Sequence, residues 1–253
     1  MFVRIVIGLF VVIAGLFWGP GHAGAETELL VSAASSLTDV FKEIGKAYAA
    51  KNPGVTVRFN FAATGPLLQQ IEQGAPVDVF ASADQQSMDK AVKGSFVLAA
   101  SRADFIGNSL TLITPVEMNG VKGLADLQSA QVLKISMGNP ESVPVGRYTK
   151  AALEKQGLWE AVIPKCVMGN SVKQVLEYVM RGEVEAGFVF GTDAVLAKDK
   201  VRVVAEIPTT MPIVYPVAVV ATSARQEQAQ AFINYLLSAE GQAILVQYGF
   251  KKL

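Results

Sequence analysis

The chain has 253 residues, 22 basic and 22 acidic residues, and 51% hydrophobic residues. This length and hydrophobic content exclude a disordered chain and fit one large domain or two lobes of ordinary size. A formal charge of zero, without basic runs or RNA-binding aromatic motifs, argues against a nucleic-acid partner.

The first 25 residues have the pattern of a cleaved secretory signal peptide. Arg4 supplies a positive charge, Ile5 to Phe17 form an apolar run, and Ala23-Gly24-Ala25 has the small-x-small spacing of a cleavage site. A membrane anchor is the alternative, but the run is shorter than the ~20 residues that a spanning helix needs. No Cys stands at this site for a lipid anchor. We therefore expect a signal peptide over 1–25 and a free protein exported to the periplasm.

Cleavage there would remove the one histidine, His22, and leave a formal charge of −1. Catalytic systems that use histidine as a base then lack it, and zinc and copper sites lack their commonest ligand. Cys166 is the one cysteine, so no internal disulfide can form, and its apolar neighbours predict a buried, inert thiol. Caps and turns explain the acidic residues Asp78, Asp84, Glu141 and Asp193 better than catalysis or cation binding does. We expect no enzyme, no cofactor and no metal-cation site.

Strand and helix patterns alternate along the first half of the remaining chain. Residues 55–61 alternate apolar with polar side chains, which is typical of a strand with one wet face. Asn52-Pro53-Gly54 ends the helical spacing that precedes it. The expected strands are 29–33, 55–61 and 77–81, and the expected helices are 41–48, 66–72 and 85–92.

The second half continues the alternation. The expected strands are 110–114, 133–137, 186–190, 201–205 and 215–221, and the expected helices are 145–156, 172–181, 231–236 and 241–248. Strands that alternate with helices of this length indicate α/β architecture, with parallel sheets covered by helices on both faces. The pattern leaves open whether the chain forms one doubly wound sheet or two smaller sheets joined by crossing strands.

Four predicted strand-to-helix junctions, 33–39, 62–66, 140–146 and 168–172, contain small or hydroxyl-bearing residues directly before a helix. Helix capping is one interpretation: Ser36 with Asp39 resembles a capping box, and Ser142 and Asn170 are ordinary cap residues. The other is that the four helix N-termini meet. Their unpaired N–H groups, together with hydroxyl donors, would then bind a compact anion without a charged side chain.

Several stretches resemble the periplasmic molybdate-binding proteins of ABC importers, and they follow the family's order and spacing from residue 34 to the C-terminus. These stretches are 34–39, 70–84, 107–110, 139–148, 187–194, 215–220 and 248–250. The resemblance implies an α/β fold of the type II periplasmic-binding-protein family. In this fold two lobes, each a mainly parallel sheet flanked by helices, are joined by crossing strands. It implies 26–108 with 213–253 as lobe I and 109–212 as lobe II.

The resemblance also implies a set of ligand-binding groups. They are the hydroxyl and backbone N–H of Ser36 and of Thr64, and the backbone N–H groups of Val145 and Val172. The fifth ligand of the family is usually a tyrosine hydroxyl, and here Phe190 stands in its place, with its ring expected at the cleft mouth. Arg147, beside this set, is expected to be a solvated surface residue or an ion-pair partner rather than a ligand.

The function implied is that of a monomeric, high-affinity binding protein that captures molybdate, and also tungstate, and delivers it to an ABC permease at the membrane. Sulfate or another tetrahedral oxyanion is the alternative ligand. A hydrolase or transferase on a similar fold is disfavoured, since the chain after the signal offers no evident base or nucleophile pair. A ligand sensor would need an effector domain, and no residues are left over for one.

Overall fold

The computed structural model describes residues 27–253, so the predicted signal peptide lies outside the described residues. Within 27–253, none of the helices combines the length and hydropathy required to cross a membrane.

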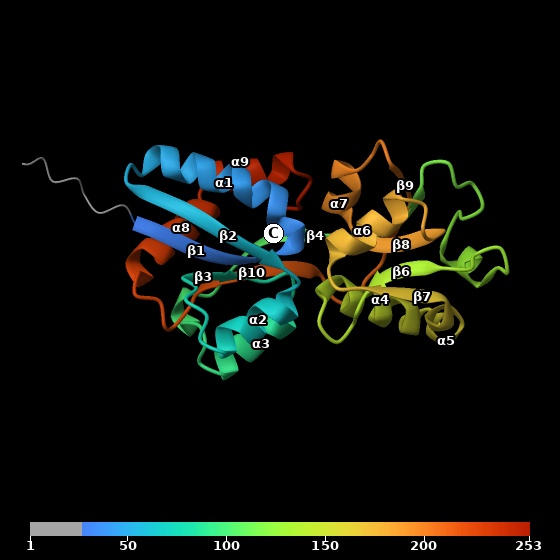
Figure 1. Cartoon of the computed structure of the whole chain (residues 1–253), viewed down its shortest axis with the longest axis horizontal. Helices are drawn as coiled ribbons and strands as arrows, with labels where there is room; N and C mark the ends of the chain where they lie inside the picture. Colours follow the sequence, from blue (N-terminus) through green and yellow to red (C-terminus); the bar gives the residue numbers. More distant parts are fainter. Residues whose placement is uncertain (1–26) are drawn as a thin grey trace, which may run out of the picture.

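Two five-stranded sheets lie side by side along the long axis of the molecule (Figure 1). Lobe I is built on the sheet of order β2-β1-β3-β10-β4, and lobe II on the sheet of order β7-β6-β8-β5-β9. The first contains β1 (Thr27–Ala34), β2 (Val55–Ala62), β3 (Val79–Ala81), β4 (Ala103–Asn108) and β10 (Ile213–Val219). The second contains β5 (Leu110–Pro115), β6 (Ile135–Gly138), β7 (Cys166–Gly169), β8 (Ala186–Phe190) and β9 (Val201–Ile207).

One strand in each sheet runs against the other four. β10 pairs antiparallel with β3 and β4, and β5 pairs antiparallel with β8 and β9. Each of these two strands is the first that the chain forms after it crosses from the other lobe. It starts at the edge where its neighbours end, since Ile213 lies opposite Asn108 and Leu110 lies opposite Phe190. The sheets are therefore mixed, with the crossing strands reversed.

Helices cover both faces of each sheet, as the strand-helix alternation predicts. In lobe I, α1 (Thr38–Lys51), α8 (Gln226–Leu237) and α9 (Ala239–Gln247) pack over one face, and α2 (Thr64–Glu72) and α3 (Gln85–Lys93) form a separate apolar cluster on the other. In lobe II, α6 (Val172–Met180) and α7 (Gly191–Leu196) lie on one side of the sheet, and α4 (Pro144–Lys155) and α5 (Trp159–Val162) on the other (Figure 1). Short 3-10 helices complete the fold: η1 (Ser35–Leu37), η2 (Ala99–Ser101), η3 (Leu124–Gln128) and η4 (Ile163–Lys165).

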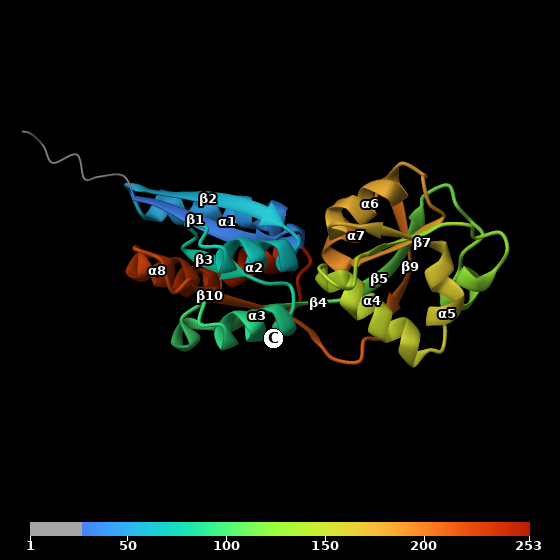
Figure 2. The same ribbon diagram turned by 60° about the horizontal axis from the view of Figure 1, so that its bottom comes forward.

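The chain crosses between the lobes twice, at the junction of β4 with β5 and through 208–212 between β9 and β10 (Figure 2). The C-terminal segment returns to the first crossing, where Gly107 and Lys251 exchange two backbone hydrogen bonds of 2.6 and 2.9 Å. The two-lobed α/β fold implied by the resemblance is confirmed, and a single doubly wound sheet is excluded.

Two strands were not predicted from the sequence. β4 reads ADFIGN, and β7 has four residues, CVMG. Asp, Gly and Asn are depleted in strands, and a four-residue strand shows too little periodicity to recognise. The neighbouring strands of each sheet supply the hydrogen bonds that hold these segments extended.

Candidate functional site

The four strand-to-helix junctions converge on one closed cavity between the lobes. The four residues that the resemblance implied as ligands and Phe190, at the position of the fifth, all line it, and all five are buried. The cavity is small, with a volume of about 10 Å³, which is close to the space that a single water molecule needs. Its lining is Ala34, Ser35, Ser36, Ala63, Thr64, Ala83, Val143, Pro144, Val145, Val172 and Phe190.

Each lobe contributes the carboxyl ends of two neighbouring parallel strands. In lobe I, Ser36 follows β1 within η1, and Thr64 follows β2 as the first residue of α2. In lobe II, Val145 follows β6 in the first turn of α4, and Val172 follows β7 as the first residue of α6. The lobes therefore face each other with the ends where helix N-termini point into the cleft.

Backbone N–H groups at these positions have no partner within their own helices, because the first turn of a helix leaves its N–H groups unpaired. In α4 the first residue is Pro144, which has no N–H, so Val145 offers the first one. None of the lining side chains carries a charge. The cavity therefore presents partial positive charge from helix ends and backbone donors, which suits an anion that has only acceptors.

The two hydroxyl groups of the cavity are each bonded to the protein. The Ser36 hydroxyl lies 2.9 Å from the hydroxyl of Tyr215, and the Thr64 hydroxyl oxygen accepts a 3.2 Å hydrogen bond from the N–H of Ala83. Neither caps its own helix, since no side-chain cap bond forms at η1, α1 or α2. Both hydroxyls retain capacity to bond a molecule in the cavity.

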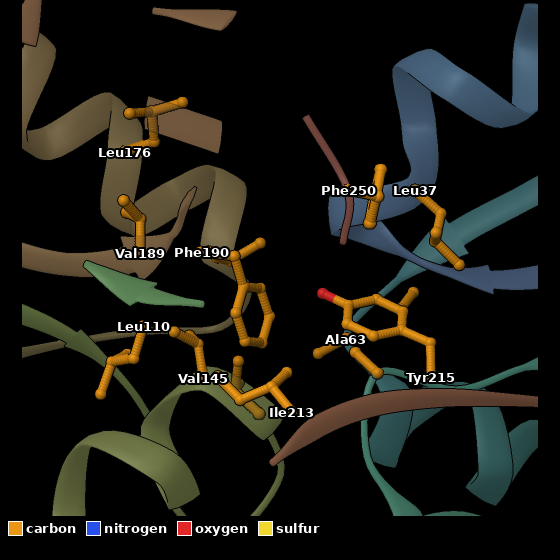
Figure 3. Packing of buried hydrophobic residues seen from close by; sticks show 14 of the residues in the cluster. Leu37, Ala63, Leu110, Val145, Leu176, Val189, Phe190, Ile213, Tyr215 and Phe250 are labelled. Carbon is orange, nitrogen blue, oxygen red and sulfur yellow. The ribbon is translucent and has the colours of Figure 1, made fainter. Parts of the chain in front are cut away.

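Phe190 does not lie at the cleft mouth, which is the position expected from the sequence. Its ring is 1% exposed and lies between Tyr215 of lobe I and Tyr148 of lobe II, with ring centroids 5.7 and 6.3 Å away. Figure 3 shows Phe190 and Tyr215 pointing toward one another from opposite sides of the cleft. The position is internal because β8 is the central strand of the lobe II sheet and Phe190, its last residue, packs against Tyr215 of lobe I.

The predicted capping roles are wrong at three positions. Asp39 bonds Lys173 instead of completing a capping box with Ser36. The residue before α4 is Val143 rather than Ser142, and it makes no side-chain cap bond. Ser171, not Asn170, caps α6 by accepting a hydrogen bond from the N–H of Gln174. In each case the helix starts one or two residues away from where the composition suggested.

Arg147 is an ion-pair partner, as predicted, and the pair joins the two lobes. Its Nε donates to Oδ2 of Asp84 at 2.7 Å, a second guanidinium nitrogen contacts the same oxygen, and it also bonds Ser87 at 3.1 Å. Asp84 caps α3 in lobe I, as predicted, while Arg147 lies on α4 in lobe II. Nearby, the N–H of Gly65 in lobe I donates to the carbonyl of Ser142 in lobe II at 3.0 Å.

A second interlobe ion pair involves Lys173, the residue after Val172. Its ammonium nitrogen lies 2.8 Å from Asp39 of lobe I and 3.2 Å from Oδ1 of Asp193 in its own lobe. Asp193 is fully buried, and its oxygens accept no well-aligned hydrogen bond within 27–253, so the contact with Lys173 is mainly Coulombic. Burial raises the pKa of Asp193 to about 6, although Lys173 opposes the shift. Asp193 lies in the first turn of α7, directly after the N-cap region at Phe190, which agrees with the predicted turn or cap position, and its contact with Lys173 is an interaction that the sequence did not indicate.

Cys166 is half-buried at the start of β7, and burial raises its pKa to about 11. The thiolate population at neutral pH is then negligible, which agrees with an inert thiol. Across 27–253, the acidic, histidine and cysteine side chains form no cluster of three or more that could hold a metal ion.

Two α/β lobes joined by two crossings, with a closed and uncharged cavity between them, define the class of proteins that bind a small solute in the cleft. The chain belongs to the bacterial extracellular solute-binding proteins, a family of binding proteins rather than enzymes, whose model matches residues 29–251. Among its relatives, the molybdate-binding protein ModA of Escherichia coli is 37% identical over 96% of this chain and 97% of its own length.

Solved structures agree with this membership. The substrate-binding domain of a molybdenum ABC transporter from Clostridium difficile is 37% identical, with a TM-score of 0.69 over 90% of this chain and 99% of that one. The periplasmic molybdate-binding protein of Azotobacter vinelandii is 25% identical, with a TM-score of 0.76 over 88% and 98%.

Sequence reasoning did not find the contacts that link the cavity to its surroundings. Tyr215 and Asn108 lie in stretches that resemble the family, but no pattern indicated that Asn108 bonds the Tyr215 hydroxyl or that this hydroxyl bonds Ser36. The ion pair of Arg147 with Asp84 joins residues 63 positions apart. Nothing in the sequence indicated that Gly65 lies at a close contact between the lobes, although a β-carbon there would lie 2.6 Å from the Ser142 carbonyl oxygen.

Proposed function

We propose that this protein is an extracytoplasmic binding protein that captures molybdate with high affinity in the cleft between its lobes and delivers it to an ABC permease. The observation that carries the proposal is the meeting of four strand-to-helix junctions, two from each lobe, around one uncharged cavity. The proposed ligand groups are the hydroxyl and N–H of Ser36 and Thr64 and the N–H groups of Val145 and Val172, with Phe190 closing one wall.

The names of the relatives support molybdate as the ligand, since ModA of E. coli is named for binding it. The chemistry of the cavity supports the same class of ligand. A tetrahedral oxyanion offers four acceptor oxygens and no donor, and the lining offers backbone N–H and hydroxyl donors without a carboxylate. Donors from both lobes can surround such an ion only when the cleft is closed, as it is in this structure.

Tungstate has the same charge and shape, so we propose that it binds as well. Sulfate is the alternative ligand, because it too is a tetrahedral dianion without a donor. Selection among these ions has to depend on the size of the cavity and on donor placement. We further propose that the mature protein begins after residue 25, lies free in the periplasm and acts as a monomer.

Isothermal titration calorimetry of residues 26–253 against molybdate, tungstate, sulfate and phosphate tests the proposal. We expect one site per chain, with tight binding of molybdate and tungstate, weaker binding of sulfate and the weakest binding of phosphate. Tight binding of sulfate with none of molybdate would overturn the assignment of the ligand but keep the site. Binding of none of the four ions would overturn both.

A further inference from the structure

The hydroxyl of Ser36 is held by a buried chain of hydrogen bonds that starts at the first interlobe crossing. The Tyr215 hydroxyl lies 2.9 Å from the Ser36 hydroxyl, and Nδ2 of Asn108 lies 3.2 Å from the Tyr215 hydroxyl. Tyr215 is fully buried, and Ser36 and Asn108 are nearly so. Tyr215 does not line the cavity, so it acts on a ligand only through Ser36.

The orientation of the Asn108 amide is set by its other bonds. Its Oδ1 accepts a 2.8 Å hydrogen bond from the N–H of Ser109, so the amide nitrogen faces the opposite way. That nitrogen donates to the hydroxyls of both Thr192 and Tyr215, at 3.0 and 3.2 Å. Since an amide nitrogen can only donate, Tyr215 receives a hydrogen bond from Asn108.

The proton of Tyr215 then has one acceptor, the Ser36 oxygen, among the contacts of the described residues. If this proton pointed elsewhere, a buried donor would remain unpaired, which destabilises the folded protein. Burial also raises the pKa of Tyr215 well above its ordinary value, so the proton is present at every physiological pH. With its oxygen receiving this bond, Ser36 directs its own proton to the cavity.

We infer that Asn108 and Tyr215 are positioning residues that fix Ser36 as a hydrogen-bond donor and so make the site selective for oxyanions that carry no proton. The inference rests on the proposed function, because it assigns a selectivity to the same cavity. Thr64 has the same polarity, since its oxygen accepts from the N–H of Ala83 and its proton is free for the ligand. A protonated anion, such as hydrogen phosphate, then finds donors where it needs an acceptor.

Tyr215→Phe tests the inference by releasing the Ser36 oxygen while keeping the ring. The dissociation constants of molybdate and phosphate are measured by calorimetry, directly or by competition, at pH 8, where phosphate carries one proton. We expect molybdate to bind several-fold more weakly and the selectivity for molybdate over phosphate to fall about tenfold, because Ser36 can then accept the phosphate proton. Tyr48→Phe is the matched control: it is a buried tyrosine of lobe I, packed against Phe232, and should leave the selectivity unchanged.

Asn108→Asp is the second variant, because it keeps the shape and reverses the polarity. The carboxylate accepts the proton of Tyr215, so Ser36 has to donate to Tyr215 and offers its lone pairs to the cavity. The added negative charge weakens the binding of both molybdate and hydrogen phosphate. Only the reversed polarity of Ser36 lowers the selectivity for molybdate over phosphate. The inference would be overturned if both variants weakened the binding of molybdate and of phosphate equally, or if neither variant changed the binding of these ions.

The wild-type titration separates this inference from the proposed function. If the wild type binds sulfate and not molybdate, the assigned ligand is wrong. The selectivity for sulfate over phosphate is then measured in place of that for molybdate over phosphate. A ratio that falls in Tyr215→Phe supports the inference in that case too. A wild type that binds hydrogen phosphate as tightly as an unprotonated dianion would overturn the inference even if molybdate binds.

Discussion

Single hydroxyl groups have a large influence in this cavity, because it contains no charged side chain to dominate the binding energy. A hydrogen bond to a charged acceptor contributes about 1.5–3 kcal/mol. The loss of one donor should therefore be measurable against a background of backbone N–H groups that a serine-to-alanine or threonine-to-alanine substitution leaves in place. Ser36 and Thr64 offer this test, since each lies just after one of two neighbouring strands of lobe I.

Ser36→Ala and Thr64→Ala are each expected to weaken molybdate binding tenfold or more, as roughly 1.5–3 kcal/mol of binding energy is lost. Calorimetry measures the change, and thermal unfolding shows whether the variant is folded. Ser101→Ala is a suitable control, because its hydroxyl is buried in lobe I and bonds the N–H of Val219 away from the cavity. Wild-type affinity in both cavity variants would place the site elsewhere.

Phe190 contributes a wall of the cavity but no donor. If the other donors leave one oxygen of the anion unpaired, Phe190→Tyr adds the missing hydroxyl and is expected to tighten molybdate binding by about 1–2 kcal/mol. Phe190→Leu, which adds no donor, should not tighten it. A loss of affinity above ~1 kcal/mol in Phe190→Tyr would show instead that the hydroxyl crowds the buried ring site between Tyr148 and Tyr215.

Asp193 makes the stability of the protein depend on pH. Burial raises its pKa to about 6 in the folded state, against ~3.9 in an unfolded chain. Between pH 4 and pH 6 the folded state therefore binds more protons, so this group makes stability fall as pH rises through that window. Asp193→Asn removes this contribution, so its stability should not show this fall. The melting temperature of the variant minus that of wild type should therefore increase from pH 4 to pH 7. A difference that stays constant with pH would contradict the assigned shift.

At the scale of elements, the sequence predicts most helices and strands but not the side chains that meet between them. The junctions before α1, α2, α4 and α6 stood out because small and hydroxyl-bearing residues precede a helical pattern. Tyr215 did not stand out, because most of β10 is buried on both faces and the strand lacks the alternation that shows which side chains point inward. Arg147 and Lys173 each pair with an acidic residue of the other lobe, and no local sequence pattern indicates a contact between residues so far apart in the chain.

The first turn of α2 also brings the lobes into contact. A β-carbon on Gly65 would lie 2.6 Å from the carbonyl oxygen of Ser142, which is too close for the closed cleft. Alanine is favoured over glycine in a helix by about 1 kcal/mol, so Gly65→Ala should keep or raise the stability of the ligand-free protein. It should nevertheless weaken molybdate binding at least tenfold, because the lobes cannot close fully.

Gly120→Ala is the control for this substitution, since a β-carbon there meets no atom within 4 Å. Thermal unfolding without ligand and calorimetry with molybdate give the two readouts. If Gly65→Ala binds molybdate as tightly as wild type does, the close contact with Ser142 is not required for the bound state.

At the scale of the whole molecule, the contacts between the lobes on either side of the cavity depend on closure. Arg147 with Asp84 and Lys173 with Asp39 each join a residue of lobe II to one of lobe I. The two crossings near Asn108 and at 208–212 are the connections about which the lobes can turn, as in other hinged domains. Opening the cleft therefore breaks ion pairs as well as exposing the ligand groups, and a bound anion shifts the balance toward the closed form.

Arg147→Met tests how far such a pair stabilises the closed form. Asp84 would keep its bond to the N–H of Ser87 at the start of α3, so lobe I should remain intact. Because the pair exists only when the lobes are closed, the variant should unfold like wild type without ligand but bind molybdate several-fold more weakly. Arg102→Met is the matched control, since Arg102 pairs with Asp89 within lobe I and its substitution should leave affinity unchanged.

Solution scattering gives a second measurement of closure. Saturating molybdate should reduce the radius of gyration of wild type, and Arg147→Met should need more molybdate for the same reduction. Equal affinity of Arg147→Met and wild type would show that the ion pair follows closure without stabilising it.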